Sequence, residues 1–174
     1  EIAKYLVGEG RLCKVAHVPL TKKFDLEVIS PLPNLIDTTY EQLHKELYRI
    51  LDELIQNHKT TLVFTNTRAG TERVVHHLKT LFPSKYMENI GAHHGSLSKR
   101  HRFHIEEKLR KGELRVVVSS TSLELGLDIG YIDLVVCLGS PKSVARLAQR
   151  IGRSGHRLHD TVKGRVIVLD RDDL

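Results

Sequence analysis

The sequence predicts an α/β fold built on an open, mostly parallel sheet with helices on both faces. Strand-like and helix-like segments alternate from about residue 60 to the end of the chain. The predicted strands are continuous apolar runs, such as 116–118 and 134–136. Because a strand covered on both faces has no side turned to water, such runs are typical of parallel sheets between helix layers.

The first third of the chain predicts two strands, a connector and a helix. Residues 11–18 and 23–29 roughly alternate polar and apolar side chains, as half-exposed strands do. The segment 30–34 contains two prolines and is typical of a connector. Leucine and isoleucine then recur at helical spacing, which predicts an amphipathic helix over 38–57. Since the chain begins at Glu1 on a strand-like or linker-like segment, we expect it to be a fragment of a longer protein.

The remaining elements follow the same alternation. We expect strands at 61–64, within 85–94, and at 115–119, 133–138 and 165–169. Between them we expect helices around 74–82, 98–111 and 143–151. Ser98 is a suitable cap for the second of these helices, and Gly112 a suitable end.

Length and composition indicate one globular domain. The chain has 174 residues, of which 40% are hydrophobic and 28% charged, as is ordinary for a folded domain. Its net charge of +6 favours a polyanionic partner without proving one. No apolar run reaches the roughly 20 residues of a membrane span, and no signal peptide occurs, so we expect a cytoplasmic location without membrane contact.

Cysteine and histidine give no sign of a metal site. Cys13 and Cys137 are the only cysteines, and neither has neighbours at metal-ligand spacing. Cys137 lies inside an apolar run, which favours a buried, reduced thiol. None of the eleven histidines stands in a familiar ligand spacing with carboxylates, so we expect no bound metal in this chain.

The run 149–157 is the most informative segment of the sequence. It contains one glutamine, three arginines and two glycines in nine residues at the end of a predicted helix. Glycine allows a close approach of the backbone, and the planar guanidinium matches phosphate oxygens. Nothing in the chain resembles a phosphate-cradling loop. The run therefore predicts one half of a two-part polyphosphate site, with Arg153 exposed on the rim of the sheet.

Polar residues gather where the predicted strands end, at 65–68, 93–96, 120–128 and 139–143. In parallel sheets these ends meet at one edge, where helix N-termini favour anions. Helix capping alone explains any single cluster. Four clusters on one rim of a basic chain favour a surface that contacts several phosphates.

Five segments, in order, resemble the second RecA-like motor domain of superfamily-two helicases. They are Thr-Asn-Thr-Arg at 65–68, 93–98, 122–128, 139–143 and 149–157. The strings Ser-Leu-Glu-Leu-Gly and Gly-Ser-Pro-Lys-Ser-Val-Ala-Arg resemble the Lhr (large helicase-related) branch. The likeness covers about 60–174 and implies a three-layer RecA-like fold of the P-loop NTPase type. It also implies interdomain strands or a linker over 1–34 and the motor domain over 35–174.

The resemblance implies an ATP-driven motor on nucleic acid, with DNA favoured over RNA. The cofactors would be ATP and Mg²⁺, and the phosphate loop and Mg²⁺ ligands would lie on the first RecA-like domain of the same polypeptide. That domain would be the second partner of this chain. On its own, the present domain would hydrolyse essentially no ATP.

The resemblance also implies roles for individual residues. The catalytic positions facing ATP would be Gln149, Arg150, Arg153 as arginine finger, and Arg157. The other nucleotide contacts would come from Gly126, Asp128 and His156. The nucleic-acid backbone would be met by Thr65, Arg68, His94, Gly95, Arg102 and Ser120.

Two positions depart from the helicase pattern. His156 stands where many relatives have a second finger arginine, and Arg157 follows it, so which of the two contacts phosphate stays open. Ser120 stands where threonine is usual, which keeps a hydroxyl group.

Two other functions remain as alternatives. One is a non-catalytic nucleic-acid-binding or assembly module derived from a motor domain, which would not need Arg153 or Asp128. The other is a Rossmann-type nucleotide enzyme, which the absence of a GxGxxG run after any predicted strand disfavours.

Overall fold

The chain folds around one sheet of six parallel strands, in the order β1-β6-β5-β2-β4-β3. The computed structural model describes residues 2–11, 13–14, 22–125, 127–155 and 160–170. The strands are β1 (Phe24–Ile29), β2 (Thr61–Phe64), β3 (Ile90–His93), β4 (Val116–Ser119), β5 (Leu134–Leu138) and β6 (Val162–Ile167). The helices are α1 (Ile2–Val7), α2 (Tyr40–Gln56), α3 (Arg68–Leu81), α4 (Pro83–Tyr86), α5 (Lys99–Arg110) and α6 (Val144–Ile151).

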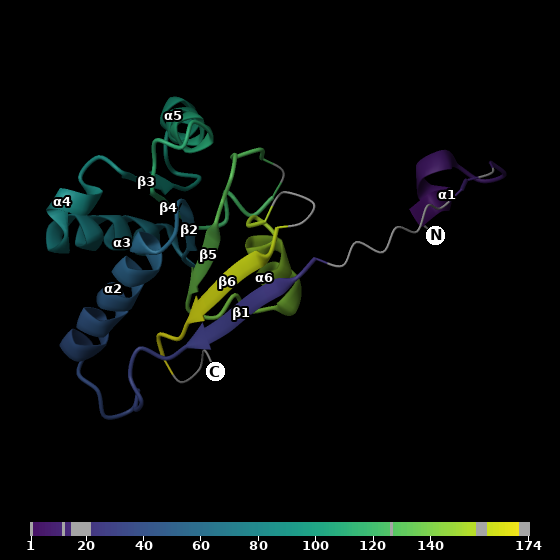
Figure 1. Cartoon of the computed structure of the whole chain (residues 1–174). Helices are drawn as coiled ribbons and strands as arrows, with labels where there is room; N and C mark the ends of the chain where they lie inside the picture. The colour runs from purple at the N-terminus through teal and green to yellow at the C-terminus, as the bar shows by residue number, and fades with distance from the viewer. Residues whose placement is uncertain (1, 12, 15–21, 126, 156–159, 171–174) are drawn as a thin grey trace.

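Helices cover both faces of the sheet, which gives three layers (Figure 1). Val63 in the central strand β2 packs into the core formed with α2, α3 and α4. Its neighbours Leu62 and Phe64 pack on the opposite side, with α5, α6 and the segment 123–132. Because successive side chains of a strand point to opposite faces, a wholly apolar strand fills both cores. The predicted open parallel α/β sheet is confirmed.

The strand register brings the polar loops to one edge. Phe64, the last residue of β2, lies opposite Ser119 of β4 and Cys137 of β5, and His93 of β3 is also opposite Ser119. The strands before these loops therefore end at nearly one level. The segments after β2, β3, β4 and β5 leave from the same rim, which we call the carboxyl rim.

Three elements differ from the sequence-based expectations. Residues 2–7 form a helix instead of a strand-like segment, and Pro83 begins the short, unpredicted helix α4. The last strand runs over 162–167 instead of 165–169, because its pairing with β1 begins at Val162. Most of the strand expected at 11–18 lies outside the described residues.

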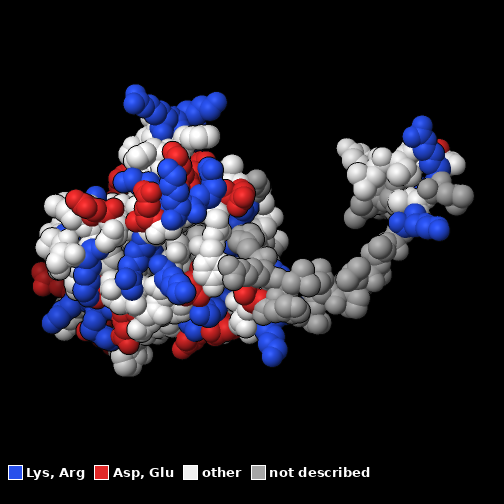
Figure 2. All heavy atoms as spheres, turned by 45° about the horizontal axis from the view of Figure 1, so that its top comes forward, with Lys and Arg blue, Asp and Glu red and all other residues white. Residues whose placement is uncertain are grey.

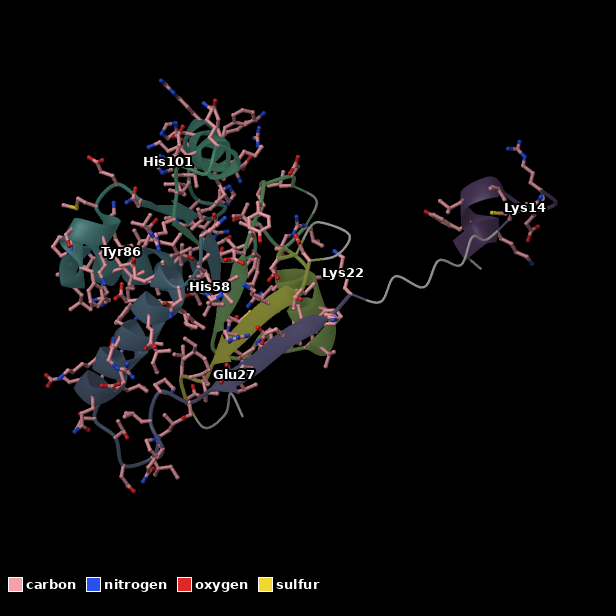
Figure 3. The ribbon with its side chains drawn as sticks, in the orientation of Figure 1. Lys14, Lys22, Glu27, His58, Tyr86 and His101 are labelled. Carbon is pink, nitrogen blue, oxygen red and sulfur yellow. The ribbon has the colours of Figure 1, made fainter. Side chains whose placement is uncertain are left out.

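β1 belongs to this sheet, although it lies in the 1–34 segment assigned to interdomain strands. All six of its residues pair with β6, and Arg165 forms ion pairs with Asp25 at 3.0 Å and with Glu27 at 3.2 Å (Figure 3 labels Glu27). The other face of β1 carries three exposed apolar side chains, Phe24, Leu26 and Val28. The division at residue 34 itself stays a prediction.

Among the described helices, none combines the length and apolar character needed to cross a bilayer.

Candidate functional site

Side-chain hydrogen bonds join the loops of the carboxyl rim, and the loop after β4 is joined to the end of β3 because the Ser122 hydroxyl donates to the His93 carbonyl at 3.0 Å. The Asn66 amide donates to the Ser140 carbonyl at 2.9 Å, which links the loops after β2 and β5. Arg68 donates to the Ser96 hydroxyl at 2.7 Å, which links the loops after β2 and β3. The segments that the sequence marks as functional therefore form one connected edge.

Two of the four polar clusters contain a helix cap, as the simpler interpretation predicts, and Ser98 caps a third helix just after the cluster 93–96. The side-chain oxygens of Thr67, Ser98 and Ser143 accept hydrogen bonds from the first turns of α3, α5 and α6. These three hydroxyls stabilise helix ends. They are distinct from the residues predicted to contact nucleotide or nucleic acid.

Arg150 is the most deeply buried charge near the rim. Its Nε donates to Glu124 Oε1 at 2.7 Å, and its Nη1 donates to Asn66 Oδ1 at 3.3 Å. The guanidinium lies 5.1 Å from the centre of the Phe64 ring, a cation–π contact. Its Nη2 has no hydrogen-bond partner among the described residues. Arg150, predicted to face ATP, thus points into the domain and connects α6 with the loops after β2 and β4.

Arg153 is half-buried and contacts its own domain, whereas the sequence predicts an exposed side chain. Its Nε and Nη2 donate to the Glu124 carbonyl at 3.1 and 2.9 Å, and Nη1 donates to the Leu127 carbonyl at 2.8 Å. Burial lowers its pKa, although a guanidinium stays charged at neutral pH. No described carboxylate forms an ion pair with it. The cation therefore lies over the segment that precedes Asp128.

A surface hollow of about 590 Å³ separates α6 from the loop after β4. Arg153, Gln149 and Asp128 line it together. Gln149 and Asp128 are exposed, and Asp128 also accepts a hydrogen bond from the Gly130 amide at 3.2 Å. The structure thus brings these three predicted nucleotide-site residues together. The predicted residues Gly126, His156 and Arg157 lie outside the described residues.

Glu124 is the main rim residue that sequence reasoning missed. Its carboxylate bonds Arg150 and lies 3.9 Å from Arg146, while its carbonyl accepts both bonds from Arg153. Glu124 is part of the Ser-Leu-Glu-Leu-Gly string, so the sequence motif marks its position but not its role. Its partners are about 25 residues away in the chain, and only the fold shows that they meet.

The six predicted nucleic-acid residues differ in accessibility. Arg68 and Gly95 are exposed, and Arg102 is half-buried. Thr65, His94 and Ser120 are buried. The first three can meet a ligand through their own atoms, whereas the buried three would act mainly by shaping the loops.

Internal partners explain the burial of Thr65 and His94. The Thr65 hydroxyl donates to the Thr67 carbonyl at 2.9 Å and lies 2.9 Å from the Thr71 hydroxyl. His94 Nε2 is 2.6 Å from a Glu72 carboxylate oxygen, and its Nδ1 has no hydrogen-bond partner among the described residues. Both side chains hold the starts of α3 and the loop after β3 in place.

His93 connects two further rim elements. Its Nδ1 is 2.7 Å from the Ser122 hydroxyl and its Nε2 is 2.9 Å from a Glu106 carboxylate oxygen on α5. Burial lowers its pKa, against the opposing effect of Glu106. The Ser122 hydroxyl also donates to the His93 carbonyl at 3.0 Å, which gives the loop after β4 a second contact with the end of β3. The bridge fixes the loop after β4 relative to α5.

The hollow carries polar side chains of the kinds that bind phosphate and ribose groups. They are the Arg153 guanidinium, the Gln149 amide and the Asp128 carboxylate, while the Glu124 carboxylate, also at the hollow, is bonded to Arg150. No group of three or more histidine, cysteine, aspartate or glutamate side chains suited to a metal occurs in the described ranges.

Comparison with known proteins shows the family of the chain. Residues 42–157 match the model of the helicase conserved C-terminal domain. The chain is 58% identical over its whole length to the ATP-dependent helicase Lhr-Core of Methanocaldococcus jannaschii. It spans only 20% of that relative's length.

Two solved structures are similar in fold and in sequence. The Mycobacterium smegmatis helicase Lhr, bound to single-stranded DNA and AMP-PNP, matches 99% of this chain with a TM-score of 0.83 and 33% identity. The helicase MrfA bound to DNA matches 81% with a TM-score of 0.69 and 30% identity. The chain covers 23% and 20% of those two proteins.

Proposed function

Because the chain belongs to the helicase C-terminal domain family, in the Lhr branch of superfamily two, we propose that it is the second motor domain of an ATP-dependent helicase. In this proposal the first RecA-like domain of the same polypeptide holds Mg²⁺–ATP. The present domain completes the site and grips the nucleic acid. DNA is the favoured substrate, since two similar helicases are described in complex with it.

The nucleotide side of the proposal rests on Arg153. A guanidinium supplied from a second domain stabilises charge that develops on the transferred phosphoryl group, typically by about 10³–10⁵ in rate. Gln149 and Asp128 line the same hollow and would orient the phosphate chain and the ribose. We assign Arg150 a supporting part, since it is buried against Glu124, whose carbonyl holds Arg153. Arg157 and His156 are the proposed further phosphate contacts.

The nucleic-acid side rests on the exposed groups of the carboxyl rim. Arg68 and Arg102 would pair with backbone phosphates, and Gly95 would let the strand approach the loop after β3. The buried Thr65, His94 and Ser120 would keep these loops in shape. Contacts of this kind carry little base information and weaken with salt.

The observation that carries the proposal is the shared hollow of Arg153, Gln149 and Asp128 beside a connected rim. A non-catalytic binding module would use the rim but would not need the hollow. The two functions therefore differ in one property, the dependence of ATP hydrolysis on Arg153.

The test uses the full-length protein, the isolated domain and their Arg153→Ala variants. We expect DNA-stimulated ATP hydrolysis by the full-length protein, a loss of about 10³-fold or more in its Arg153→Ala variant, and none from the isolated domain. Arg49→Ala, which removes an exposed arginine of α2, serves as the matched control and should keep full activity.

Two results would contradict the proposal. ATP hydrolysis by the isolated domain that is lost on Arg153→Ala would show that the site is complete in this chain. Unchanged hydrolysis by the full-length Arg153→Ala variant would favour the binding-module alternative.

A further inference from the structure

The outer face of α5 carries an exposed aromatic ring in a basic setting. The Phe103 side chain is 58% exposed, although phenylalanine usually lies in a core. Arg100 and His104 precede and follow it on the outward side of the same helix, and both are exposed. These three residues form what we call the α5 face. Neither the helix nor the sheet requires a ring at this position.

The α5 face is not packed against the domain. Ile105 and Leu109 fill the core on the opposite side of α5, so the helix is anchored without Phe103. A hollow of about 840 Å³ lies over the outer side and is lined by Phe103, Arg100 and their neighbours. The ring is therefore accessible to a ligand from solvent.

Charge on α5 favours an anionic ligand. The helix contains five lysines or arginines and two glutamates. Glu106 points inward to His93, and Glu107 forms an ion pair with Lys111 at 2.8 Å. Both negative charges are therefore partly compensated and repel an anionic ligand only weakly. In Figure 2, which turns the top of Figure 1 forward, Lys and Arg side chains project from the region of α5. Figure 3 labels His101 on the same helix.

The α5 face also continues the carboxyl rim. α5 begins directly after the loop that follows β3, and the Leu97 amide donates to the His94 carbonyl at 3.1 Å. Arg68 reaches across to Ser96 in that loop. The N-terminal end of α5 therefore lies next to the loop that carries Gly95 and contacts Arg68.

We propose that the α5 face is a stacking site for an unpaired base of a single-stranded nucleic acid, with Phe103 beneath the base and Arg100 on the adjoining phosphate. The proposal rests on the proposed helicase function and adds a contact outside the rim. An aromatic ring with flanking cations is the arrangement that single-strand-binding proteins use, since every base has a face that can stack. His104 would border the same nucleotide.

The test measures binding of the full-length protein to fluorescein-labelled oligothymidylate at several salt concentrations. Phe103→Ala should weaken binding about 5- to 100-fold with an unchanged salt slope, since stacking releases no counterion. Phe103→Tyr should bind like wild type. Arg100→Ala should weaken binding and reduce the slope by about 0.7, the share of one phosphate on a single strand. Lys45→Ala, on the opposite face of the sheet, is the charge-matched control.

The rim variant Arg68→Ala separates the two proposals. If Arg68→Ala weakens binding while Phe103→Ala does not, the rim grips the strand and the α5 proposal is wrong. An equal loss by Phe103→Ala on a blunt duplex would also overturn it, because paired bases cannot stack on the ring. If the wild-type protein does not bind oligothymidylate at all, the proposed function fails, and the α5 face with it.

Discussion

Arg150 and Glu124 form a buried ion pair, with 2.7 Å between Nε and the carboxylate, at the point where the loop after β4 meets α6. The same glutamate holds Arg153 through its carbonyl. One residue thus connects an internal cation with the proposed arginine finger. This pair makes the stability of the domain and the position of Arg153 depend on each other.

Breaking the pair on one side should destabilise the domain strongly. Glu124→Ala or Arg150→Ala leaves an uncompensated buried charge, which typically costs about 3–5 kcal/mol. The double variant Glu124→Leu/Arg150→Met removes both charges and should lose much less. Urea denaturation followed by circular dichroism measures the difference. A double variant as unstable as the sum of its single changes would contradict the coupling.

The buried histidine His93 should make the domain less stable in mild acid. Its folded pKa is lowered mainly by burial, so the unfolded chain binds a proton more readily. Above pH 6.5, the ordinary pKa of histidine in an unfolded chain, His93 should not lower the free energy of unfolding. As the pH drops below 6.5, the free energy of unfolding should fall. Denaturant titrations between pH 8 and about 5 test this.

Two variants assign that pH dependence. His93→Gln keeps a polar side chain without the titration, and its stability should change less below the ordinary pKa. Burial also lowers the pKa of His44. His44 should therefore contribute separately to the fall of stability with pH, and His44→Gln should remove that contribution. A slope that neither variant changes would place the titrating group elsewhere.

The two cysteines should react very differently with a thiol reagent. Cys13 is exposed, whereas Cys137 is buried in β5 and burial raises its pKa to about 11. Since the thiolate is the reactive form, iodoacetamide should modify only Cys13 in the native protein. Mass spectrometry should then find one modified cysteine before denaturation and two after it. Native labelling of Cys137 would mean that β5 opens readily.

Gly164 should not tolerate a side chain. A Cβ there would lie 2.7 Å from the Leu26 Cδ2 and 2.8 Å from the Ile151 Cγ2. Gly164→Ala should therefore destabilise the contact of β1 and α6 with β6 by about 1–3 kcal/mol. Gly95→Ala, whose new methyl group would find its nearest neighbour at 3.8 Å, is the control and should change the melting temperature little. Equal melting temperatures for both variants would contradict the close packing.

The sequence predicts most of the sheet because its strands are fully buried. Runs such as 116–118 and 134–136 are apolar on both faces, and only a strand between two helix layers requires that. The short helices α1 and α4 were not predicted, because six and four residues are too few to show a helical period. The pairing of β1 with β6 has no local signal in either strand.

The site could be predicted as a set of residues but not as a geometry. The described residues of the motifs 65–68, 122–128 and 149–157 lie near the carboxyl rim, and their functional roles stay predictions. Arg150 and Arg153 look alike in the sequence. Only the fold shows that Arg150 is buried against the Glu124 carboxylate, whereas Arg153 donates to backbone carbonyls of the loop after β4. In the same way, His93 and His94 are adjacent, but they contact Glu106 and Glu72 from different helices.

The pairing of β1 with β6 has a consequence for how the chain is made. A ribosome delivers Phe24 long before Val162, and these two residues are register partners at the outer edge of the sheet. Strands β2, β3, β4 and β5 can associate during translation, but β1 must wait for β6 to emerge. Among the described strands, the one made first is therefore among the last to be docked, and until then its backbone edge and its apolar side chains stay exposed.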